Sequence, residues 1–296
     1  MVSCIITTYK RKVEIVERAL LSILKQTYKN IEILIINDYP EDNKLVDEIG
    51  KMIEKYKTQK HIEYIVLEHH CGACKARNAG IQNSKGKYIA FLDDDDEWIE
   101  TKIEKQVEFA KKYNADLVYC NSITKNEENK TERIRHDTEQ PSGLIFNELL
   151  IKNIIGSNSF PLISKKVLTD VNGYNENLPA MQDIDLYLRI AKKANIKYIN
   201  EPLAIYHVYK GERISRNHEA KMTAYQIFVK KYSEEINKDK ELIYSYNVIG
   251  LEIYTNSKKT KKAFIYWIKV FSQKPYKIKQ NIYWFLKIIA KDIFKI

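Results

Sequence analysis

The stretch Gly86-Lys87-Tyr88-Ile89-Ala90-Phe91-Leu92-Asp93-Asp94-Asp95-Asp96 decides the fold and locates the site. Residues 88–92 are apolar, as expected of a strand that is buried on both faces of a parallel sheet. Four aspartates follow directly, and carboxylates this close repel one another unless a cation offsets their charge. A hard divalent cation would do so, and such ions usually also hold substrate phosphates. The stretch therefore predicts a buried strand that ends in a metal and phosphate site.

A simpler interpretation of the same acids is that they precede a helix. Residues 98–113 have helical spacing, and acidic side chains are favoured at a helix N-terminus. This interpretation accounts for one or two acids, with Asp96 as the cap, but not for four at the end of an apolar strand. The metal and phosphate interpretation is therefore preferred.

Strands and helices alternate on both sides of the acidic stretch. Strands are predicted at residues 2–8, 31–37, 62–67, 88–92 and 116–120, and helices at 13–26, 42–56, 73–83 and 98–113. This order predicts right-handed crossovers and a Rossmann-like, largely parallel sheet flanked by helices. Ligands bind such sheets at the carboxyl ends of the strands. The polar clusters after three strands should therefore meet at one edge.

The second half of the chain has shorter elements. Residues 121–142 are polar, and their apolar residues follow no helical or strand periodicity. They are therefore predicted to form an irregular surface segment over the site. Helices are predicted at 143–151 and 182–194, and strands at 159–163, 196–199 and 203–208. From about residue 220 the pattern is all helical. We therefore expect a domain over 1–219, with halves at about 1–120 and 121–219, and a helical extension over 220–296.

Five segments in order resemble family-2 glycosyltransferases of the GT-A fold. They are Ser3-Cys4-Ile5-Ile6-Thr7-Thr8-Tyr9-Lys10-Arg11, Leu21-Ser22-Ile23-Leu24-Lys25-Gln26-Thr27-Tyr28 with Asn37-Asp38, Cys71-Gly72-Ala73-Cys74-Lys75-Ala76-Arg77-Asn78-Ala79-Gly80, the stretch 86–96, and Gln182-Asp183. The motifs cover roughly the first 215 residues, and their joint occurrence by chance is improbable. The resemblance implies inverting transfer from a nucleotide diphosphate sugar, as in enzymes of bacterial surface polysaccharides.

The resemblance implies a set of donor contacts. The nucleotide-sugar residues are Thr7, Thr8, Tyr9, Arg11, Asp38, Arg77, Asp93 and Asp94. Asp38 would accept from the uracil or another base, Asp93 would face the ribose, and Asp94 is the variable middle residue of the DXD motif. From the residues alone, Asp38 could equally be a turn residue before Pro40. A lone Arg such as Arg77 is more often paired on the surface.

The resemblance also implies the metal and the base. Asp95 would bind Mn²⁺ or Mg²⁺, with His207 or Tyr209 nearby, and the ion would stabilise the leaving diphosphate. Asp183 would be the base that takes the acceptor proton, although Gln182 replaces the usual Glu. Asp185, two residues on, is an alternative base, and Asp183 could also cap its helix. Ser157 and Asn158 are placed at the acceptor.

The basic excess of the chain lies entirely in its tail. The net charge is +10; residues 258–296 hold eleven Lys and one Asp, which leaves 38 basic and 38 acidic residues elsewhere (49 − 11 and 39 − 1). Apolar residues recur at helical spacing in the tail, as in amphipathic helices at an anionic membrane interface. The alternative is a helical subdomain with a solvated lysine face. No nucleic-acid recognition motif accompanies the tail.

The combined prediction is a metal-dependent inverting glycosyltransferase that acts on a glycan hydroxyl. A lipid-linked acceptor would suit a cytoplasmic protein held at the inner face of the plasma membrane by its tail. A sugar nucleotidyltransferase is less favoured, because residues 7–11 contain no glycine to cradle a triphosphate. A non-catalytic glycan-binding or membrane-binding module is the third alternative.

Overall fold

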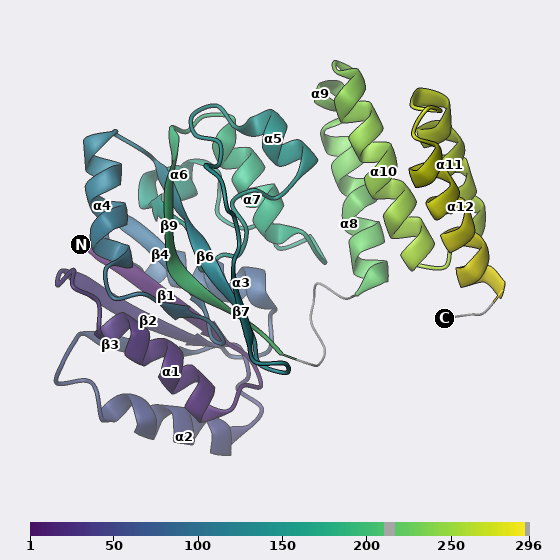
Figure 1. The fold of residues 1–296 in the computed structure, drawn as a ribbon. Helices are drawn as coiled ribbons and strands as arrows, with labels where there is room; N and C mark the ends of the chain where they lie inside the picture. The colour runs from purple at the N-terminus through teal and green to yellow at the C-terminus, as the bar shows by residue number, and fades with distance from the viewer. Residues whose placement is uncertain (210–216, 294–296) are drawn as a thin grey trace. The chain divides into compact units, whose positions relative to one another are not determined.

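The alternating strands and helices build a mixed sheet with helices on both faces (Figure 1). The computed structural model describes residues 1–209 and 217–293. Its strands are β1 (Val2–Thr8), β2 (Ile31–Asn37), β3 (Ile62–Val66), β4 (Tyr88–Asp93), β5 (Glu97–Trp98), β6 (Leu117–Asn126), β7 (Thr131–Ile134), β8 (Leu162–Ser164) and β9 (Ile196–Val208). The helices among them are α1 (Val13–Leu24), α2 (Asn43–Glu54), α3 (Ala73–Asn83), α4 (Lys102–Lys112), α5 (Phe146–Ile151), α6 (Lys165–Asp170) and α7 (Gln182–Ala191).

The sheet has a parallel half and a mixed half. Within the described residues the strand order is β3-β2-β1-β4-β8-β6-β9-β5, and β7 pairs with β6 outside this path. β3, β2, β1 and β4 run parallel, whereas β8 is antiparallel to both of its neighbours. β6 and β9 are parallel, and β5 is antiparallel to β9. The predicted Rossmann-like sheet flanked by helices is therefore confirmed: its first four strands are parallel, and its second half mixes parallel and antiparallel pairs.

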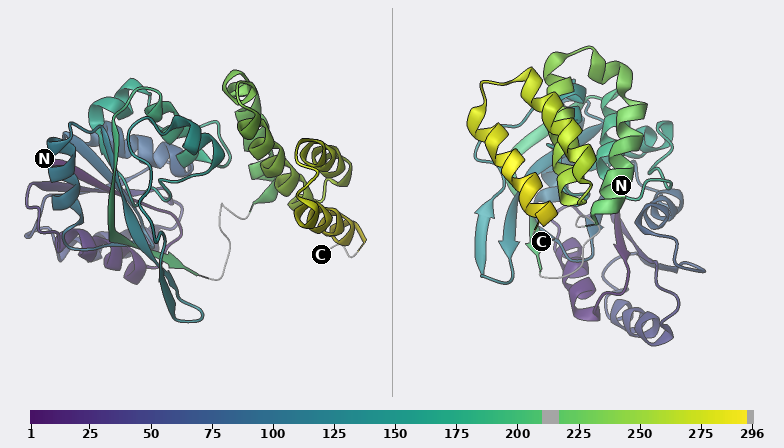
Figure 2. Two further views of the ribbon diagram at one scale, coloured as in Figure 1. Left: turned by 45° about the horizontal axis from the view of Figure 1, so that its top comes forward. Right: turned by 90° about the vertical axis from the view of Figure 1, so that its right-hand side faces the viewer.

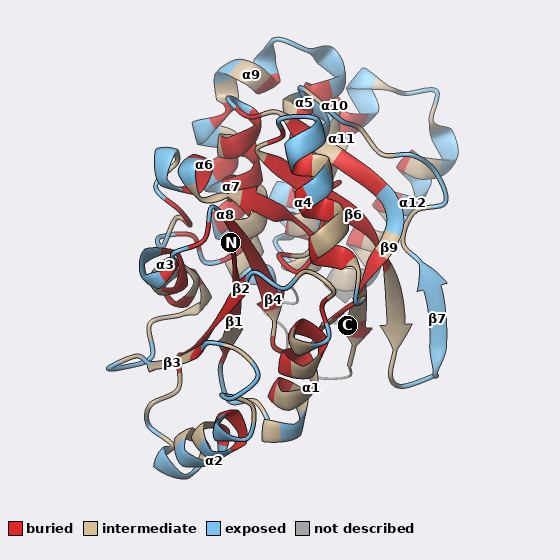
Figure 3. Ribbon diagram, turned by 90° about the vertical axis from the view of Figure 1, so that its left-hand side faces the viewer, coloured by how far each residue is buried: buried red, intermediate tan, exposed pale blue. Residues whose placement is uncertain are grey.

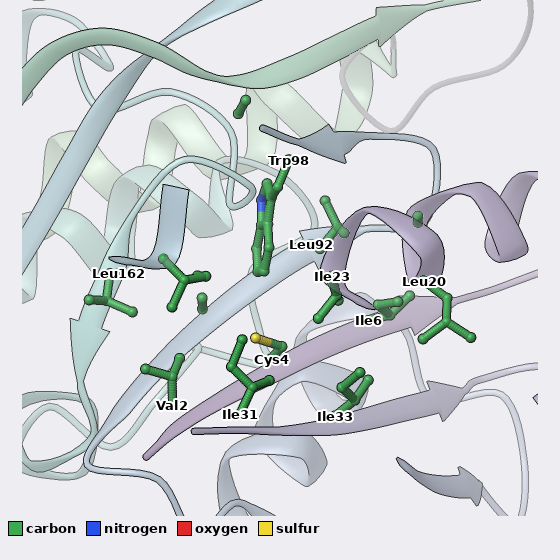
Figure 4. Packing of buried hydrophobic residues seen from close by; sticks show 14 of the residues in the cluster. Val2, Cys4, Ile6, Leu20, Ile23, Ile31, Ile33, Leu92, Trp98 and Leu162 are labelled. Carbon is green, nitrogen blue, oxygen red and sulfur yellow. The ribbon is translucent and has the colours of Figure 1, made fainter. Parts of the chain in front are cut away.

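The core explains why the first half of the sequence folds as it does. Strand residues Val2, Cys4 and Ile6 are fully buried under α1, which contributes Leu20 and Ile23 (Figure 4). α1 buries one face because its apolar residues recur every three to four positions. Figure 3 shows the strands of the sheet centre as buried and β7 as exposed. The packing is driven by the hydrophobic effect, which contributes about 25 cal/mol for each Å² of apolar surface removed from water.

Three local expectations were wrong. The helix expected from residue 98 begins at Lys102, because Glu97–Trp98 pair with β9 as the short strand β5. The irregular segment expected over 121–142 contains the end of β6 and the hairpin strand β7. The two strands expected at 196–199 and 203–208 are one strand, β9, with register shifts on its partner between Cys120 and Ser122. Short strands without apolar period leave little signal in a sequence.

The chain divides into two compact units. One unit comprises Met1–Leu149, Asn153–Glu176 and Gln182–Lys210, and contains the sheet. The other comprises Leu150–Lys152, Asn177–Met181 and Gly211–Ile296. Its helices are α8 (His218–Lys231), α9 (Ser233–Asn237), α10 (Lys240–Asn256), α11 (Thr260–Gln273) and α12 (Ile278–Ile293) (Figure 2). Among the helices of the described residues, none combines the length and apolarity needed to cross a bilayer.

Candidate functional site

The polar clusters after three parallel strands meet at one edge of the sheet, as predicted. Thr8 pairs with Asn37, and Thr7 pairs with Asp93, so β1, β2 and β4 end side by side. The backbone N–H of Asp38 donates to the Thr8 carbonyl at 2.9 Å, which continues the pairing one residue further. This register places residues 7–11, Asp38 and the acidic stretch around a common edge.

The four aspartates form a tight turn rather than the start of a helix. The N–H of Asp96 donates to the carbonyl of Asp93 at 3.0 Å, and the chain then enters β5. The next helix begins six residues after Asp96, with Thr101 at its N-cap position. The interpretation of Asp96 as a helix cap is therefore wrong. A turn lets the four carboxylates point in different directions, so that they contact side chains from several other elements.

Asp93 links β4 to a neighbouring loop. Its Oδ1 accepts from Arg77 Nη2 at 2.8 Å, and its Oδ2 accepts from the Ser157 hydroxyl at 3.1 Å. The Asp93 N–H donates to the Ser159 hydroxyl at 3.1 Å. The Arg77 guanidinium also lies over the Tyr174 ring, 5.5 Å from its centroid. Ser157, expected at the acceptor, thus contacts the residue expected at the ribose.

Asp94 and Asp95 share one arginine. Arg11 Nε donates to Asp94 Oδ1 at 2.9 Å, and Arg11 Nη2 donates to Asp95 Oδ2 at 3.2 Å. Burial raises the pKa of Asp94 to about 6, although the nearby Arg11 and Thr8 favour its charged form. Asp95 is the more exposed of the two, with about a quarter of its side chain accessible. Its carboxylate is thus open to a ligand from solvent.

Asp96 is fully buried behind the turn. Its Oδ2 accepts from the Ser159 hydroxyl at 2.6 Å, and its Oδ1 accepts from the His207 N–H at 3.2 Å. Burial raises its pKa well above the usual range, and Asp93 and Asp95 raise it further. Asp96 therefore ties the turn to β9 and to the loop that carries Ser159.

The His207 imidazole lies between two glutamates. Its Nδ1 is 2.6 Å from Glu127 Oε1, and its Nε2 is 2.8 Å from Glu97 Oε1. These hydrogen bonds lower the pKa of both glutamates. A metal ion at His207 would therefore have to displace one glutamate. The Tyr209 ring stacks on His207 with centroids 6.1 Å apart.

Aromatic rings surround Asp38 at the other end of the edge. Tyr9 stacks on His70 with ring centroids 4.2 Å apart, and Tyr39 meets Tyr9 edge-on at 5.3 Å. The Asp38 carboxylate accepts from the N–H groups of Cys71 and Gly72 at 2.7 and 2.9 Å. Asp38 thus holds the loop before α3 in place, next to flat surfaces on which a base could stack.

Asp183 lies in the same partly buried cluster as Arg77 and Asp93. Burial raises its pKa; the Ile184 N–H and Arg77 oppose this effect, and Asp93 adds to it. Its Oδ2 accepts from Asn153 Nδ2 at 2.8 Å, and its Oδ1 from the Ile184 N–H at 2.8 Å. Asp185 is fully buried and accepts from Arg189 Nε at 2.7 Å. The two aspartates of α7 therefore occupy different environments.

The loop over residues 153–159, whose Ser157 and Asn158 were expected at the acceptor, joins Asp93 to Asp183 through contacts that the sequence did not reveal. Asn153 contacts Asp183, and Ser157 contacts Asp93. Asn153 also bonds to Gly156 at both its amide atoms, and Arg135 donates to the carbonyls of Asn153 and Ile155 at 3.1 and 2.8 Å. These contacts have no sequence motif. Asn158 accepts from the Tyr174 hydroxyl at 2.7 Å and is buried.

The described residues contain no group of three or more His, Cys, Asp or Glu side chains arranged to hold a metal ion. Magnesium in phosphate-binding sites is commonly held by only one or two carboxylates together with substrate phosphates. Asp93 and Asp95 are partly exposed carboxylates on one turn. They suit that arrangement chemically, because hard cations prefer oxygen ligands.

Sequence comparison supports a single family. The family model for glycosyl transferase family 2 matches residues 3–171. An uncharacterised glycosyltransferase of Rickettsia conorii is 32% identical over 79% of this chain, and the chain spans 39% of that relative's length. The Escherichia coli UDP-Glc:alpha-D-GlcNAc-diphosphoundecaprenol beta-1,3-glucosyltransferase WfgD is 30% identical over 68% of this chain and 73% of its own length.

Structural comparison shows the same fold. The crystal structure of S. aureus TarS 1–349 in complex with UDP-GlcNAc superposes with a TM-score of 0.65 at 15% identity. The match covers 98% of this chain and 89% of that one. At this identity the likeness concerns the fold alone, and it agrees with the predicted GT-A architecture with a helical C-terminal region.

Proposed function

This chain belongs to glycosyl transferase family 2, and from that premise we propose that it transfers a sugar from a UDP-linked donor to a glycan hydroxyl, with inversion at the anomeric carbon. One observation carries the proposal: Arg77, Asp93 and Asp183 lie in one partly buried cluster, in which Arg77 pairs with Asp93 at the carboxyl end of β4. The cluster combines a cation for phosphate with a carboxylate of raised pKa, as expected of an acid–base site.

The donor would occupy the edge formed by β1, β2 and β4. The uracil would lie beside Asp38, against the aromatic cluster of Tyr9, Tyr39 and His70. Within the described residues, Arg77 Nε is buried without a hydrogen-bond partner, so the guanidinium retains a donor for a phosphate oxygen. Thr7 and Arg11 line the approach to the acidic turn.

Asp93 and Asp95 would hold Mn²⁺ or Mg²⁺ together with the donor diphosphate. When bound, the ion supplies positive charge that stabilises the departing nucleoside diphosphate. Arg11 would then release Asp95, because a divalent cation competes directly with the 3.2 Å arginine contact. Asp94 would remain paired to Arg11 as a positioning residue for the turn.

Asp183 would act as the general base. The acceptor hydroxyl oxygen attacks the anomeric carbon while its proton passes to an Asp183 carboxylate oxygen. The bond from the anomeric carbon to the diphosphate oxygen breaks on the opposite face, and UDP leaves. A base must be ionised to take the proton, and Asn153 and the Ile184 N–H favour that form. Asp185 is less suited, since Arg189 already neutralises it.

The acceptor is proposed to be a lipid-linked glycan of bacterial surface polysaccharide assembly. WfgD is named for a diphosphoundecaprenol-linked acceptor, and a Bacillus subtilis relative, 29% identical over 73% of this chain, is described as a putative teichuronic acid biosynthesis glycosyltransferase. Ser157, which contacts Asp93, and Asn158, which contacts Tyr174, would lie on the acceptor side. The protein would work on the cytoplasmic side, where nucleotide sugars are made.

Replacing Asp183 with Asn tests the mechanism. Asp183→Asn should leave the Kd for UDP within about twofold and lower transfer by at least about 100-fold, since a positioned base contributes 10²–10⁴-fold. Calorimetry with UDP and Mn²⁺ measures the first effect, and release of UDP from UDP-sugars with a diphosphoundecaprenol-linked glycan measures the second. Asp170→Asn, at an exposed aspartate paired only with Lys166, is the matched control. Unchanged transfer by Asp183→Asn would remove Asp183 as the base.

A further inference from the structure

The last two helices of the chain form an antiparallel hairpin. α11 and α12 lie side by side (Figures 1 and 2). Between them the Trp267 and Phe285 rings pack with centroids 5.3 Å apart, and Trp267 Nε1 donates to the Asn281 carbonyl at 2.9 Å. Phe264 meets the same Phe285 ring at 5.9 Å. These contacts define the seam of the hairpin.

Both helices turn their buried side toward α10. On α11 the Tyr266 ring packs on Tyr254 of α10, with centroids 5.1 Å apart. On α12, Gln280 accepts from the Tyr244 hydroxyl of α10 at 3.3 Å. Val270 of α11 and Ile288 of α12 are buried on this inner side, together with Ala263 and Trp284. α10 therefore covers one side of the hairpin.

The opposite side of the hairpin is apolar although it faces outward. Its residues are Ile265, Ile268 and Phe271 of α11 and Ile278, Ile282 and Leu286 of α12, each between 44% and 63% exposed. They recur every three or four positions, so each helix carries one stripe. Because the helices share a seam and both face α10, the two stripes lie on the same outward side. We call these six residues the outward apolar face.

This arrangement differs from that of a usual surface helix, because apolar residues lie on the exposed side of the hairpin as well as on its buried side. Helices of globular proteins normally expose their polar side and bury their apolar side. Contiguous exposed apolar surface marks a site of interaction with a protein or a membrane. The outward apolar face therefore requires a partner.

The charge around the face identifies the partner. The exposed lysines Lys261 and Lys279 accompany the apolar stripes, whereas the ammonium groups of Lys262 and Lys269 lie over the rings of Tyr254 and Tyr266 on the α10 side. Residues 258–296 hold eleven Lys and one Asp. A second copy of the hairpin would bring two such positive surfaces together, which is unfavourable. An anionic lipid surface accepts apolar side chains and neutralises lysines at the same time.

We propose that the outward apolar face binds an anionic lipid bilayer, with α11 and α12 lying in the headgroup region and their apolar stripes reaching the acyl chains. Long lysine side chains can cross this depth and keep their ammonium groups at the phosphates. The interaction would hold the catalytic unit at the surface where a lipid-linked acceptor resides. It deepens the proposed function but does not depend on sugar transfer.

A triple variant of exposed residues tests the face. Ile268→Ser, Ile282→Ser and Leu286→Ser together should lower vesicle partitioning of the full-length chain by at least about 100-fold, because each apolar side chain contributes to insertion. Co-sedimentation with phosphatidylcholine vesicles, with and without phosphatidylglycerol, measures the effect. Leu144→Ser and Ile134→Ser, at exposed apolar residues of the catalytic unit, form the matched control and should bind as the parent does.

Two further measurements distinguish the alternatives. UDP binding should be unchanged in the triple variant. A loss of membrane binding is therefore measured separately from a loss of the proposed nucleotide-sugar binding. Light scattering without lipid should show the same mass for the parent and the triple variant. The proposal is overturned if the parent does not bind phosphatidylglycerol vesicles, if the triple variant binds them equally, or if the parent self-associates and the variant does not.

Discussion

Asn153 connects Asp183, the proposed base, with the loop that contacts Asp93, a proposed donor residue. Its amide donates to Asp183 at 2.8 Å and bonds to Gly156 at both ends. Gly156 immediately precedes Ser157, which contacts Asp93. A single amide side chain thus fixes one end of the gap relative to the other, and its removal should alter the base without altering the nucleotide pocket.

We expect Asn153→Ala to raise the pKa of Asp183. A hydrogen bond to a carboxylate favours the charged form, so losing it should move the acidic limb of the kcat/KM profile upward by about one pH unit. Asn153→Asp, which places a like charge beside Asp183, should move it further. The Kd for UDP should not change in either variant. Asn83→Ala, at an exposed amide on α3, is the control. If Asn153→Ala lowered activity equally at every pH without shifting the acidic limb of the profile, Asn153 would not act on the pKa of Asp183.

Asp94 should cost the protein stability at neutral pH. Its pKa rises from 3.8 to about 6 because it is buried. An acid whose pKa is higher in the folded state holds its proton more tightly there, so stability falls as the pH rises from about 4 through 6. The difference corresponds to at most about 3 kcal/mol.

The substitution Asp94→Asn should therefore raise the free energy of unfolding at pH 7 by about 1–3 kcal/mol. At pH 4 the two proteins should be nearly equal, because Asp94 is then protonated in the folded state. Urea unfolding at both pH values measures this. Equal stabilisation at both pH values would show that packing, not titration, is responsible.

The residues that could be predicted were those attached to strand ends. Thr8, Asp38 and Asp93 follow apolar runs, and parallel strands bring such positions together. The roles within the acidic stretch could not be predicted, because they depend on Arg11, Ser159 and His207, which reach the turn from other elements. The side-chain partners of His207 follow from the pairing of β5 and β9, which sequence periodicity did not reveal.

At the scale of elements, the loop over residues 153–159 depends on a backbone that only glycine adopts easily. Gly156 has φ +96°, and a Cβ there would lie 2.3 Å from Arg135 Nη1. Arg135 is held in turn by two carbonyls of the same loop. The loop conformation and the arginine therefore support each other.

Gly156→Ala should destabilise the protein by about 2–4 kcal/mol, from backbone strain together with the displacement of Arg135, and should lower kcat. Gly143→Ala is a matched control, since Gly143 has φ +90° with no atom within 4 Å of a Cβ, so it carries the backbone strain without the clash. Thermal unfolding and sugar transfer of the two variants separate the effects. If both variants lost the same free energy of unfolding, the displacement of Arg135 would not contribute to the effect.

Long periodic elements could be predicted, whereas among the three shortest strands only β8 was expected, at residues 159–163 instead of 162–164. α3 has the predicted bounds of 73–83, and β2 the predicted bounds of 31–37. β5, β7 and β8 have two, four and three residues, too few to establish a period, and they make the second half of the sheet mixed. Their pairing is decided by contacts with strands far along the chain.

At the scale of the whole molecule, the charge is divided between a neutral body and a basic tail. Deleting residues 258–296 would remove Val270 and Ile288 from the packing on α10, so the loss of membrane binding in such a truncation would be mixed with misfolding. The surface variants avoid this problem, because the six residues of the outward apolar face are exposed.

Salt should weaken the electrostatic contribution to membrane binding but not the contribution of the apolar side chains. Screening shortens the range of surface charges to about 3 Å at 1 M ionic strength. Vesicle partitioning of the parent should therefore weaken steeply between low salt and about 1 M salt, with a smaller slope after Lys261 and Lys279 are changed to Gln. Co-sedimentation over a salt series measures the slope; equal slopes would exclude these lysines from the interaction.

The antiparallel insertion of β8 between β4 and β6 has a practical consequence for recombination between relatives. β6 runs from Leu117 to Asn126 and so crosses the point where the donor and acceptor halves would be divided by sequence. Chimeras joined near residue 120 would cut a strand that is hydrogen-bonded on both sides. To exchange acceptor preference, one would graft the short 153–159 loop together with its Arg135 rather than swap halves.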